Sequence, residues 1–257
     1  MAGRPFVETG FLNRSIDGDD RRYCVYVPAD YDPTRRWPVI LFLHGAGEGG
    51  QDGLLMTEYQ LGSAIRRNAA GYPGLVVFPQ CRSRQRVWHS SDVNHAVEIL
   101  EQVTNEFAVD SERMYITGVS TGAKAAWHAL YRHPDLFAAG LIVAGVIRPI
   151  GHSGHSGHSG HSGHRLHDPD PIVPGEEVHP HRVLARQLER MPLWIFHGDD
   201  DPVFDVGDAR EIVDELQAID APVRYTELGG FGHDVWDIAY YSDEVATWLF
   251  SQRRSAQ

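Results

Sequence analysis

Short apolar runs of strand length recur along the chain. They lie at residues 23–27, 39–43, 75–78, 114–116, 141–144, 193–196 and 223–228. From residue 39 onward most of these runs are continuous rather than alternating with polar residues, which is typical of strands that are covered on both faces. The pattern therefore predicts buried strands of a mostly parallel sheet.

Stretches with helical spacing of apolar residues lie between these runs. One such face carries Val93, Ala96, Val97, Leu100, Val103 and Phe107, and another carries Ala209, Ile212, Val213 and Leu216. Amphipathic faces of this kind pack one side of a helix against a core. Because strands and helices alternate, we expect an α/β fold in one domain over residues 1–257, with helices on both faces of the sheet.

The first two elements break this alternation. Residues 6–16 and 22–27 are separated only by the polar turn at 17–20. Two strands joined by so short a turn pair as a hairpin. The pattern predicts an antiparallel hairpin at one edge of the sheet.

One connection, residues 145–191, is longer than most others and contains no convincing strand. It holds the repeat GHSGHSGHSGHSGH at 151–164, a segment rich in Pro and Asp, and a short helical pattern at 183–188. It has too few apolar residues for a core of its own. We therefore expect a lid-like insertion just before the strand at 193–196, not a second domain.

Composition and charge narrow the possible partners. The chain has 257 residues, 42% of them hydrophobic, which suffices for a sizeable core, and a net charge of −12. This charge argues against a nucleic acid or an anionic membrane as partner. No apolar run approaches the roughly 20 residues needed to span a bilayer. We expect no membrane span.

The N-terminal residues and the cysteines bear on the compartment. MAGRPFVETG contains no apolar signal segment, so the chain as it stands predicts a cytoplasmic protein, while a secreted mature form stays open. Cys24 and Cys81 lack metal-ligand spacing. We expect two free thiols in preference to one disulfide.

The strongest local motif is GVSTG at residues 118–122. It follows the strand at 114–116 and precedes a helical pattern at 123–131. A G-x-S-x-G between strand and helix is a nucleophile elbow, in which glycines two residues away relieve a strained serine backbone. The helix N-terminus favours negative charge there. The motif predicts Ser120 as a nucleophile, with a helix N-cap as the alternative.

A nucleophilic serine requires a histidine to accept its proton and a carboxylate to orient that histidine. HGDDD at 197–201 follows one predicted strand, and GGFGHD at 229–234 follows the next. Both loops lie at the carboxyl edge, where open α/β folds place their sites. The alternatives for the acid are Asp199, Asp200, Asp201 and Asp234, and the rivals of His233 as base include His44, His95, His128 and His197.

Two further features bear on substrate binding. The glycine-rich loop HGAGEGG at 44–50 follows the strand at 39–43, and its backbone N–H groups, with that of Thr121, form a candidate oxyanion hole. Trp88 and Trp236 are candidate walls for an acyl or aryl pocket, and core packing is the alternative for both.

Four segments together, LFLHGAGEGG, GVSTGA, WIFHGDDDPVF and GGFGHDVWDIAY, resemble the α/β-hydrolase superfamily. More narrowly, they resemble carboxylesterases grouped with feruloyl esterases, polyhydroxybutyrate-depolymerase-like proteins and prolyl-oligopeptidase-type catalytic domains. The resemblance covers residues 22–250 except 145–191. It implies an α/β-hydrolase fold, Asp201 as the acid, His233 as the base, and Ala46 and Thr121 as donors of the oxyanion hole. Where the family often has S-M-G-G, this chain has Ser120-Thr121-Gly122-Ala123, which keeps the required glycine.

The resemblance also implies the reaction. We expect hydrolysis of short acyl or aryl (feruloyl-type) carboxylic esters through an acyl-enzyme, with a small-molecule ester as substrate and no cofactor. A prolyl-oligopeptidase-type serine peptidase is an alternative, although such enzymes normally carry an N-terminal propeller for which 257 residues leave no room. A non-catalytic binding protein with the same fold is the other alternative, against which the full set of three residues argues.

The GHS repeat does not form a second elbow. Two residues after each serine stands a histidine instead of a glycine, and no strand precedes the segment. In an extended chain its histidines would align along one face, which is a pattern that binds divalent metals. We expect at most adventitious metal binding, and no functional metal site, at His152, His155, His158, His161 and His164.

Overall fold

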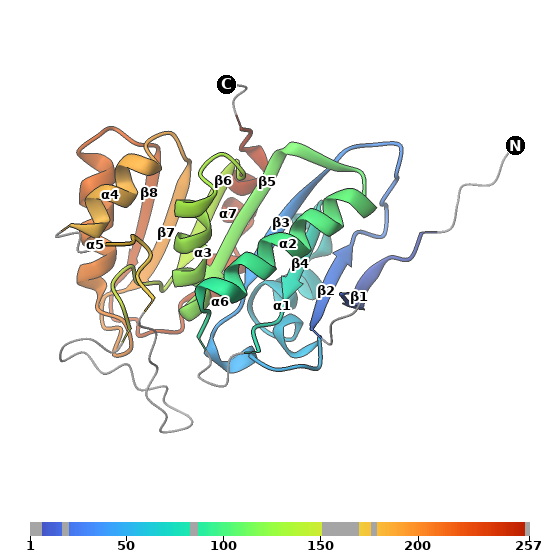
Figure 1. Cartoon of the computed structure of the whole chain (residues 1–257), viewed down its shortest axis with the longest axis horizontal. Helices are drawn as coiled ribbons and strands as arrows, with labels where there is room; N and C mark the ends of the chain where they lie inside the picture. Colours follow the sequence, from blue (N-terminus) through green and yellow to red (C-terminus); the bar gives the residue numbers. More distant parts are fainter. Residues whose placement is uncertain (1–6, 17–20, 83–86, 151–169, 176–178, 255–257) are drawn as a thin grey trace, which may run out of the picture.

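The computed structural model describes residues 7–16, 21–82, 87–150, 170–175 and 179–254 (Figure 1). Its described strands form one sheet in the order β1-β2-β4-β3-β5-β6-β7-β8. The strands are β1 (Gly10–Ser15), β2 (Arg22–Val27), β3 (Trp37–Leu43), β4 (Leu75–Pro79), β5 (Val109–Val119), β6 (Ala139–Val143), β7 (Leu193–Gly198) and β8 (Val223–Leu228). All neighbouring pairs from β4 to β8 are parallel. This confirms the predicted α/β fold with a mostly parallel sheet.

The predicted hairpin is also confirmed. β1 pairs with β2 in antiparallel orientation, and β2 in turn pairs antiparallel with β4, so β1 is the edge strand. Every residue of β3 is buried. The continuous apolar runs therefore do mark strands that are covered on both faces.

Helices cover the two faces of the sheet. The described helices are α1 (Gln60–Arg67), α2 (Ser90–Glu106), α3 (Thr121–Arg132), α4 (Pro180–Gln187), α5 (Val206–Gln217), α6 (Trp236–Tyr240) and α7 (Asp243–Ser251), with the short 3-10 helices η1 (Ala46–Glu48), η2 (Leu55–Thr57) and η3 (Ala69–Gly71). The core on one face draws on α2, α3, α4 and α5, and the core on the other draws on α1, α6 and α7. The sequence expectation of helices on both faces holds.

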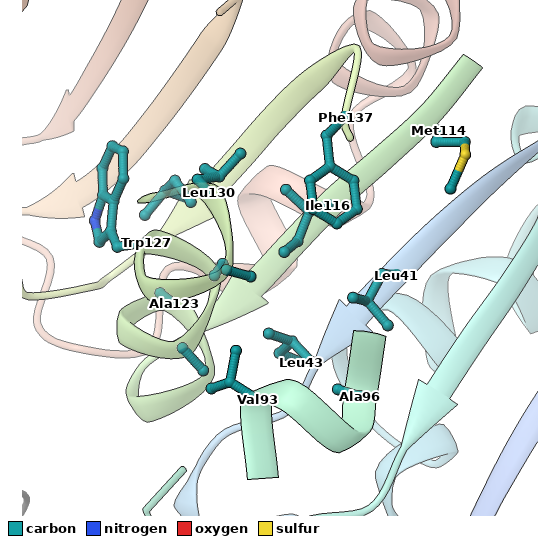
Figure 2. Close-up of a cluster of buried hydrophobic side chains, with 14 of the residues drawn as sticks. Leu41, Leu43, Val93, Ala96, Met114, Ile116, Ala123, Trp127, Leu130 and Phe137 are labelled. Carbon is teal, nitrogen blue, oxygen red and sulfur yellow. The ribbon is translucent and has the colours of Figure 1, made fainter. Parts of the chain in front are cut away.

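Alternation along β3 shows how the two cores share one strand. Leu41 and Leu43 face the core under α2 and α3, whereas Ile40 and Phe42 face the opposite core. Figure 2 shows Leu43 close to the α2 side chains of Val93 and Ala96. Because β3 is packed from both sides, the loop that follows its carboxyl end is attached to a rigid part of the sheet.

β5 is longer than its apolar run of 114–116 predicted. It begins at Val109 and includes Asp110, Ser111, Glu112 and Arg113, of which Ser111 and Glu112 are exposed. Asp110 Oδ2 accepts a hydrogen bond from Arg113 Nε at 2.7 Å. Polar residues can extend a strand where it leaves the core, so hydrophobic periodicity marks only its buried part.

The described parts of the 145–191 connection pack against the rest of the chain. α4 packs on α5, and Ile172 and Val173 are buried in the core that α2 and α3 share. Asp170 Oδ2 accepts hydrogen bonds from the backbone N–H and the hydroxyl of Ser90, at 3.1 Å each. The GHS repeat lies outside the described residues, so a lid over the site stays a prediction.

Two smaller expectations can be compared with the structure. Cys24 and Cys81 are both buried and are not joined in a disulfide, in agreement with the prediction of two thiols. Among the helices of the described residues, none combines the length and apolarity that crossing a bilayer requires.

Candidate active site

The turn between β5 and α3 places Ser120 in a strained conformation. Its φ is 56° and its ψ is −122°, a combination that residues other than glycine rarely adopt. A Cβ on Gly118 would lie 2.1 Å from the carbonyl oxygen of Gly122, and a Cβ on Gly122 would lie 2.0 Å from that of Leu43. No side chain fits at either position. The glycines predicted from the motif are therefore required by contact with backbone atoms.

Three side chains from three loops form a chain of hydrogen bonds. Ser120 Oγ lies 2.8 Å from His233 Nε2, and His233 Nδ1 lies 2.7 Å from Asp201 Oδ2. Because an ionised carboxylate can only accept, the hydrogen of the imidazole resides on Nδ1, and Nε2 accepts from the serine hydroxyl. The three loops follow β5, β7 and β8, so the parallel sheet brings together residues that are far apart in sequence.

The side chain of Asp201 is fully buried, and both of its oxygens have donors nearby. Its Oδ1 accepts the backbone N–H groups of Val203, at 2.7 Å, and Phe204, at 3.0 Å. Its Oδ2 lies 3.2 Å from His197 Nε2 besides its contact with His233. Burial alone would raise the pKa of Asp201, but hydrogen bonds from His197, His233 and the Phe204 amide hold it well below its usual range. The carboxyl group is therefore ionised at neutral pH.

The other aspartates of this region make different contacts. Asp199 Oδ1 accepts the backbone N–H of Gly230 at 2.6 Å, which links the loops after β7 and β8. Asp200 is exposed, and its backbone N–H donates to the carbonyl oxygen of Phe231. Asp234 follows His233 directly in the chain. Of the four carboxylates considered, the structure brings Asp201 to His233.

The rival histidines are placed elsewhere. His44 is buried beside its own loop, where its Nδ1 lies 2.6 Å from the carbonyl oxygen of Gly45 and its Nε2 accepts the N–H of Cys81 at 2.9 Å. Burial lowers the pKa of His44 to about 4. His95 and His128 lie on α2 and α3, and His197 contacts Asp201. His44 is therefore neutral at pH 7, with its two ring nitrogens facing backbone groups and its ring against Trp88.

Ala46 and Thr121 are the first residues of the two helical segments next to Ser120. Ala46 is the first residue of η1 and Thr121 the first of α3. The first N–H groups of a helix have no acceptor within it, and they carry partial positive charge. A Cβ on Gly45 would lie 3.6 Å from the Cβ of Ser120, so the loop that carries Ala46 runs directly against the nucleophile candidate. This arrangement suits a pair of backbone donors for an anion.

Glu48 lies in the same loop and was not singled out by its sequence. Its side chain is largely buried, and Oε1 accepts a hydrogen bond from Gln60 Nε2 at 3.2 Å. Burial raises the pKa of Glu48 above its ordinary value. Twelve residues separate the partners, and Gln60 has a positive φ of 46°. No sequence pattern indicates such a pair, which ties η1 to the start of α1.

The aromatic candidates differ in position. The Trp236 ring stands edge-on to His233 with centroids 5.9 Å apart, and Phe204, which sequence reasoning missed, stands edge-on at 5.3 Å. Trp88 is buried in the core, and its Nε1 donates to the carbonyl oxygen of His44 at 2.9 Å. Trp236 thus lies beside the site, whereas Trp88 lies in the core and bonds the backbone of the loop after β3.

Within the described residues, His, Cys, Asp and Glu side chains form no group of three that could hold a metal ion. The five histidines of the repeat, for which adventitious metal binding is the expectation, lie outside those residues.

Comparison with known proteins gives one family match. The model of the prolyl oligopeptidase family matches residues 82–251, which include all three members of the hydrogen-bonded chain. An uncharacterized secreted protein of Arthroderma benhamiae is 24% identical over 213 residues, which are 79% of this chain and 22% of the relative. Acetylxylan esterase A of Emericella nidulans is 27% identical over 99 residues, which are 34% of this chain and 33% of the relative. The chain thus spans a third or less of the length of these curated relatives.

Solved structures show the same architecture. A thermostable esterase superposes with a TM-score of 0.71 and 27% identity, over 95% of this chain and 63% of that one. A ferulic acid esterase superposes with a TM-score of 0.68 over 93% of this chain and 96% of that one. At 16% identity the second comparison speaks for the fold alone. The chain has the α/β-hydrolase architecture.

Proposed function

Because this chain belongs to the prolyl oligopeptidase family, we propose that it is a serine hydrolase that cleaves carboxylic esters through an acyl-enzyme. The observation that carries the proposal is the chain of hydrogen bonds from Ser120 through His233 to Asp201. Each of the three residues follows the carboxyl end of a parallel strand. The distances between them are the hydrogen-bond distances that proton transfer requires. The esterases among the structural and curated relatives support the same reaction class.

The first half of the reaction forms the acyl-enzyme. Ser120 Oγ attacks the ester carbonyl carbon while its proton passes to His233 Nε2, 2.8 Å away. Asp201 holds the resulting imidazolium through the Nδ1 hydrogen bond and stabilises its charge. The tetrahedral intermediate then expels the alcohol, whose oxygen takes the proton from Nε2. The second half repeats these steps with water as the nucleophile and releases the acid.

The negative charge that develops on the carbonyl oxygen needs donors. We propose the backbone N–H groups of Ala46 and Thr121 for this role, because both residues begin helical segments beside Ser120. A preorganised donor of this kind contributes roughly 3–4 kcal/mol to transition-state stabilisation. The proposed reaction requires no cofactor, since the protein supplies nucleophile, base and oxyanion donors.

The substrate class follows from the relatives and from the aromatic side chains at the site. The curated relatives include an acetylxylan esterase, and the sequence motifs resemble those of feruloyl esterases, so we propose acyl groups that range from acetyl to aromatic acids. Trp236 is partly exposed beside His233 and provides an apolar ring for such a group. A serine peptidase is the alternative, because the family model carries that name.

A fluorophosphonate probe tests the nucleophile. Wild type is expected to be labelled and to hydrolyse p-nitrophenyl acetate, whereas Ser120→Ala is expected to lose both properties, with kcat lower by roughly 10⁴-fold or more. A matched control is Ser90→Ala, which removes a hydroxyl from the start of α2. Labelling of Ser120→Ala, or absence of labelling and turnover in wild type, would exclude the proposal.

The substrate is tested with a panel. p-Nitrophenyl esters of increasing chain length, methyl ferulate and a prolyl amide are compared by kcat/KM. A preference for esters supports the proposal, and a higher kcat/KM for the amide supports the peptidase.

A further inference from the structure

The Asp201 carboxylate has a second imidazole neighbour. His197 Nε2 lies 3.2 Å from Asp201 Oδ2, the same oxygen that receives the Nδ1 hydrogen of His233. His197 Nε2 also lies 3.1 Å from the carbonyl oxygen of Phe204. The His197 ring is fully buried, so water does not compete for these contacts.

The neighbours of this ring assign its hydrogen. Both groups near Nε2 are acceptors, a carboxylate oxygen and a carbonyl oxygen, so Nε2 carries the hydrogen and shares it between them. Among the described residues, Nδ1 has no hydrogen-bond partner. A second hydrogen on Nδ1 would therefore be left without an acceptor. The ring acts as a single N–H donor directed at the loop after β7.

The origin of this donor distinguishes it from the others that hold Asp201. The N–H groups of Val203 and Phe204 belong to the same loop as Asp201, and they move with that loop. His197 belongs to β7, where it pairs in register with Glu227 of β8. One N–H thus connects the carboxylate and the Phe204 peptide to the sheet. The strand therefore adds a contact at Oδ2 to the two that the loop makes at Oδ1.

We infer that His197 is a positioning residue for the reaction, which holds the Asp201 carboxylate so that Oδ2 faces His233. The inference rests on the proposed function, because only proton transfer from Ser120 demands this orientation. A neutral donor suits the role, since it fixes the carboxylate without competing as a second positive charge for the imidazolium that forms on His233.

Two substitutions at this position test the inference. His197→Gln keeps an N–H donor at nearly the reach of Nε2, whereas His197→Met keeps an unbranched side chain of similar length without a donor. His197→Met is expected to lower kcat by roughly 10- to 100-fold with KM changed by less than about threefold, because the acid is misplaced by a fraction of an ångström. His197→Gln is expected to recover most of the loss.

The division of the effect between kcat and KM, together with the rescue by His197→Gln, separates positioning from a merely structural role. A structural defect lowers the fraction of active protein but leaves the rate of each active site unchanged. All rates are divided by the fraction of protein that the fluorophosphonate probe labels. If His197→Met only lowers Tm and leaves kcat per labelled site unchanged, the inference is wrong.

A measurement without turnover keeps the inference separate from the proposed function. The Nδ1 proton of His233, held by a short bond to a carboxylate, is expected far downfield in the proton NMR spectrum of wild type and of Ser120→Ala. It should move upfield or broaden in His197→Met and return in His197→Gln. A protein that hydrolyses no ester yet shows this pattern would retain the positioning role, whereas an unchanged signal in His197→Met would overturn it.

Discussion

The chain contains two His-Gly pairs, each at the carboxyl end of a parallel strand, and their histidines have different partners. His44-Gly45 follows β3 and His197-Gly198 ends β7, both at the carboxyl edge of the sheet. The two ring nitrogens of His44 face backbone groups, the Gly45 carbonyl oxygen and the Cys81 N–H, and the ring packs against Trp88. The imidazole of His197 instead contacts the carboxylate of Asp201. One ring therefore bonds backbone groups, and the other contacts a charged side chain.

The difference arises from the loop on the C-terminal side of each pair. After Gly45 the chain forms η1, so the nearest acceptor to the ring is a peptide. After Gly198 it forms a turn that presents Asp201 four residues beyond His197. The same dipeptide therefore acquires its role from the loop it introduces. Predictions on activity, on folding and on pH dependence break or sharpen this comparison.

The largest effect is expected from removing the charge that distinguishes the second pair. Asp201→Asn leaves the His197 donor in place but replaces the carboxylate with an amide that cannot hold the imidazolium. We expect kcat to fall by about 10⁴-fold. The control is Asp199→Asn, which changes a neighbouring carboxylate that bonds Gly230 and should lower kcat by less than about tenfold. Comparable losses in both variants would place the acid elsewhere.

The glycines of the two pairs are expected to differ in tolerance. A Cβ on Gly198 would lie 2.2 Å from the carbonyl oxygen of Gly232, which is backbone of the His233 loop. A Cβ on Gly45 would lie 3.3 Å from Glu48 Oε2, the end of a side chain that can shift. Gly198→Ala is expected to lower the free energy of unfolding by about 3 kcal/mol or more, and Gly45→Ala by about 1 kcal/mol. Urea unfolding measures both, and equal losses would contradict the difference.

The next prediction concerns the pH dependence of stability. The pKa of His44 is lowered from 6.5 in the unfolded chain to about 4 in the folded protein. The unfolded state therefore binds a proton first, and the free energy of unfolding falls as pH decreases from about 6.5 to about 4, by roughly 2–4 kcal/mol in total. His44→Gln, which does not titrate, should be less stable at pH 7 but should lose less between pH 7 and pH 5.

Asp201 affects the free energy of unfolding at lower pH than His44 does. Its pKa is lowered from 3.8, so its contribution is complete above that value and is lost as pH falls further. Asp201→Asn is therefore expected to flatten the stability profile below about pH 4. Urea unfolding of Asp201→Asn and wild type measures this difference, and parallel profiles below pH 4 would contradict it.

The sequence predicted the framework of the site well, because the framework depends on local rules. The elbow around Ser120 requires glycines at fixed spacing, and strand order brings three loops to one edge. The choice among three consecutive aspartates needed the family resemblance. Composition and spacing alone left them equivalent.

The features that the sequence did not predict depend on contacts between distant segments. His197 and His44 carry the same flanking glycine, and only the folded loops distinguish their partners. Glu48 meets Gln60 across twelve residues through a backbone conformation that no propensity favours. The polar start of β5 likewise has no apolar signature. Side-chain partners of this kind are set by tertiary packing.

The place of β8 in the sheet has a consequence for how the site is lost. β8 is the last strand in the order and is only partly buried, whereas β5 lies between β3 and β6. Edge segments open by local unfolding at a lower free energy than central ones. His233 follows the edge strand and Ser120 follows the central one. Amide hydrogen exchange should therefore be faster in β8 than in β5. Mild heating should displace His233 while Ser120 remains on an intact part of the sheet.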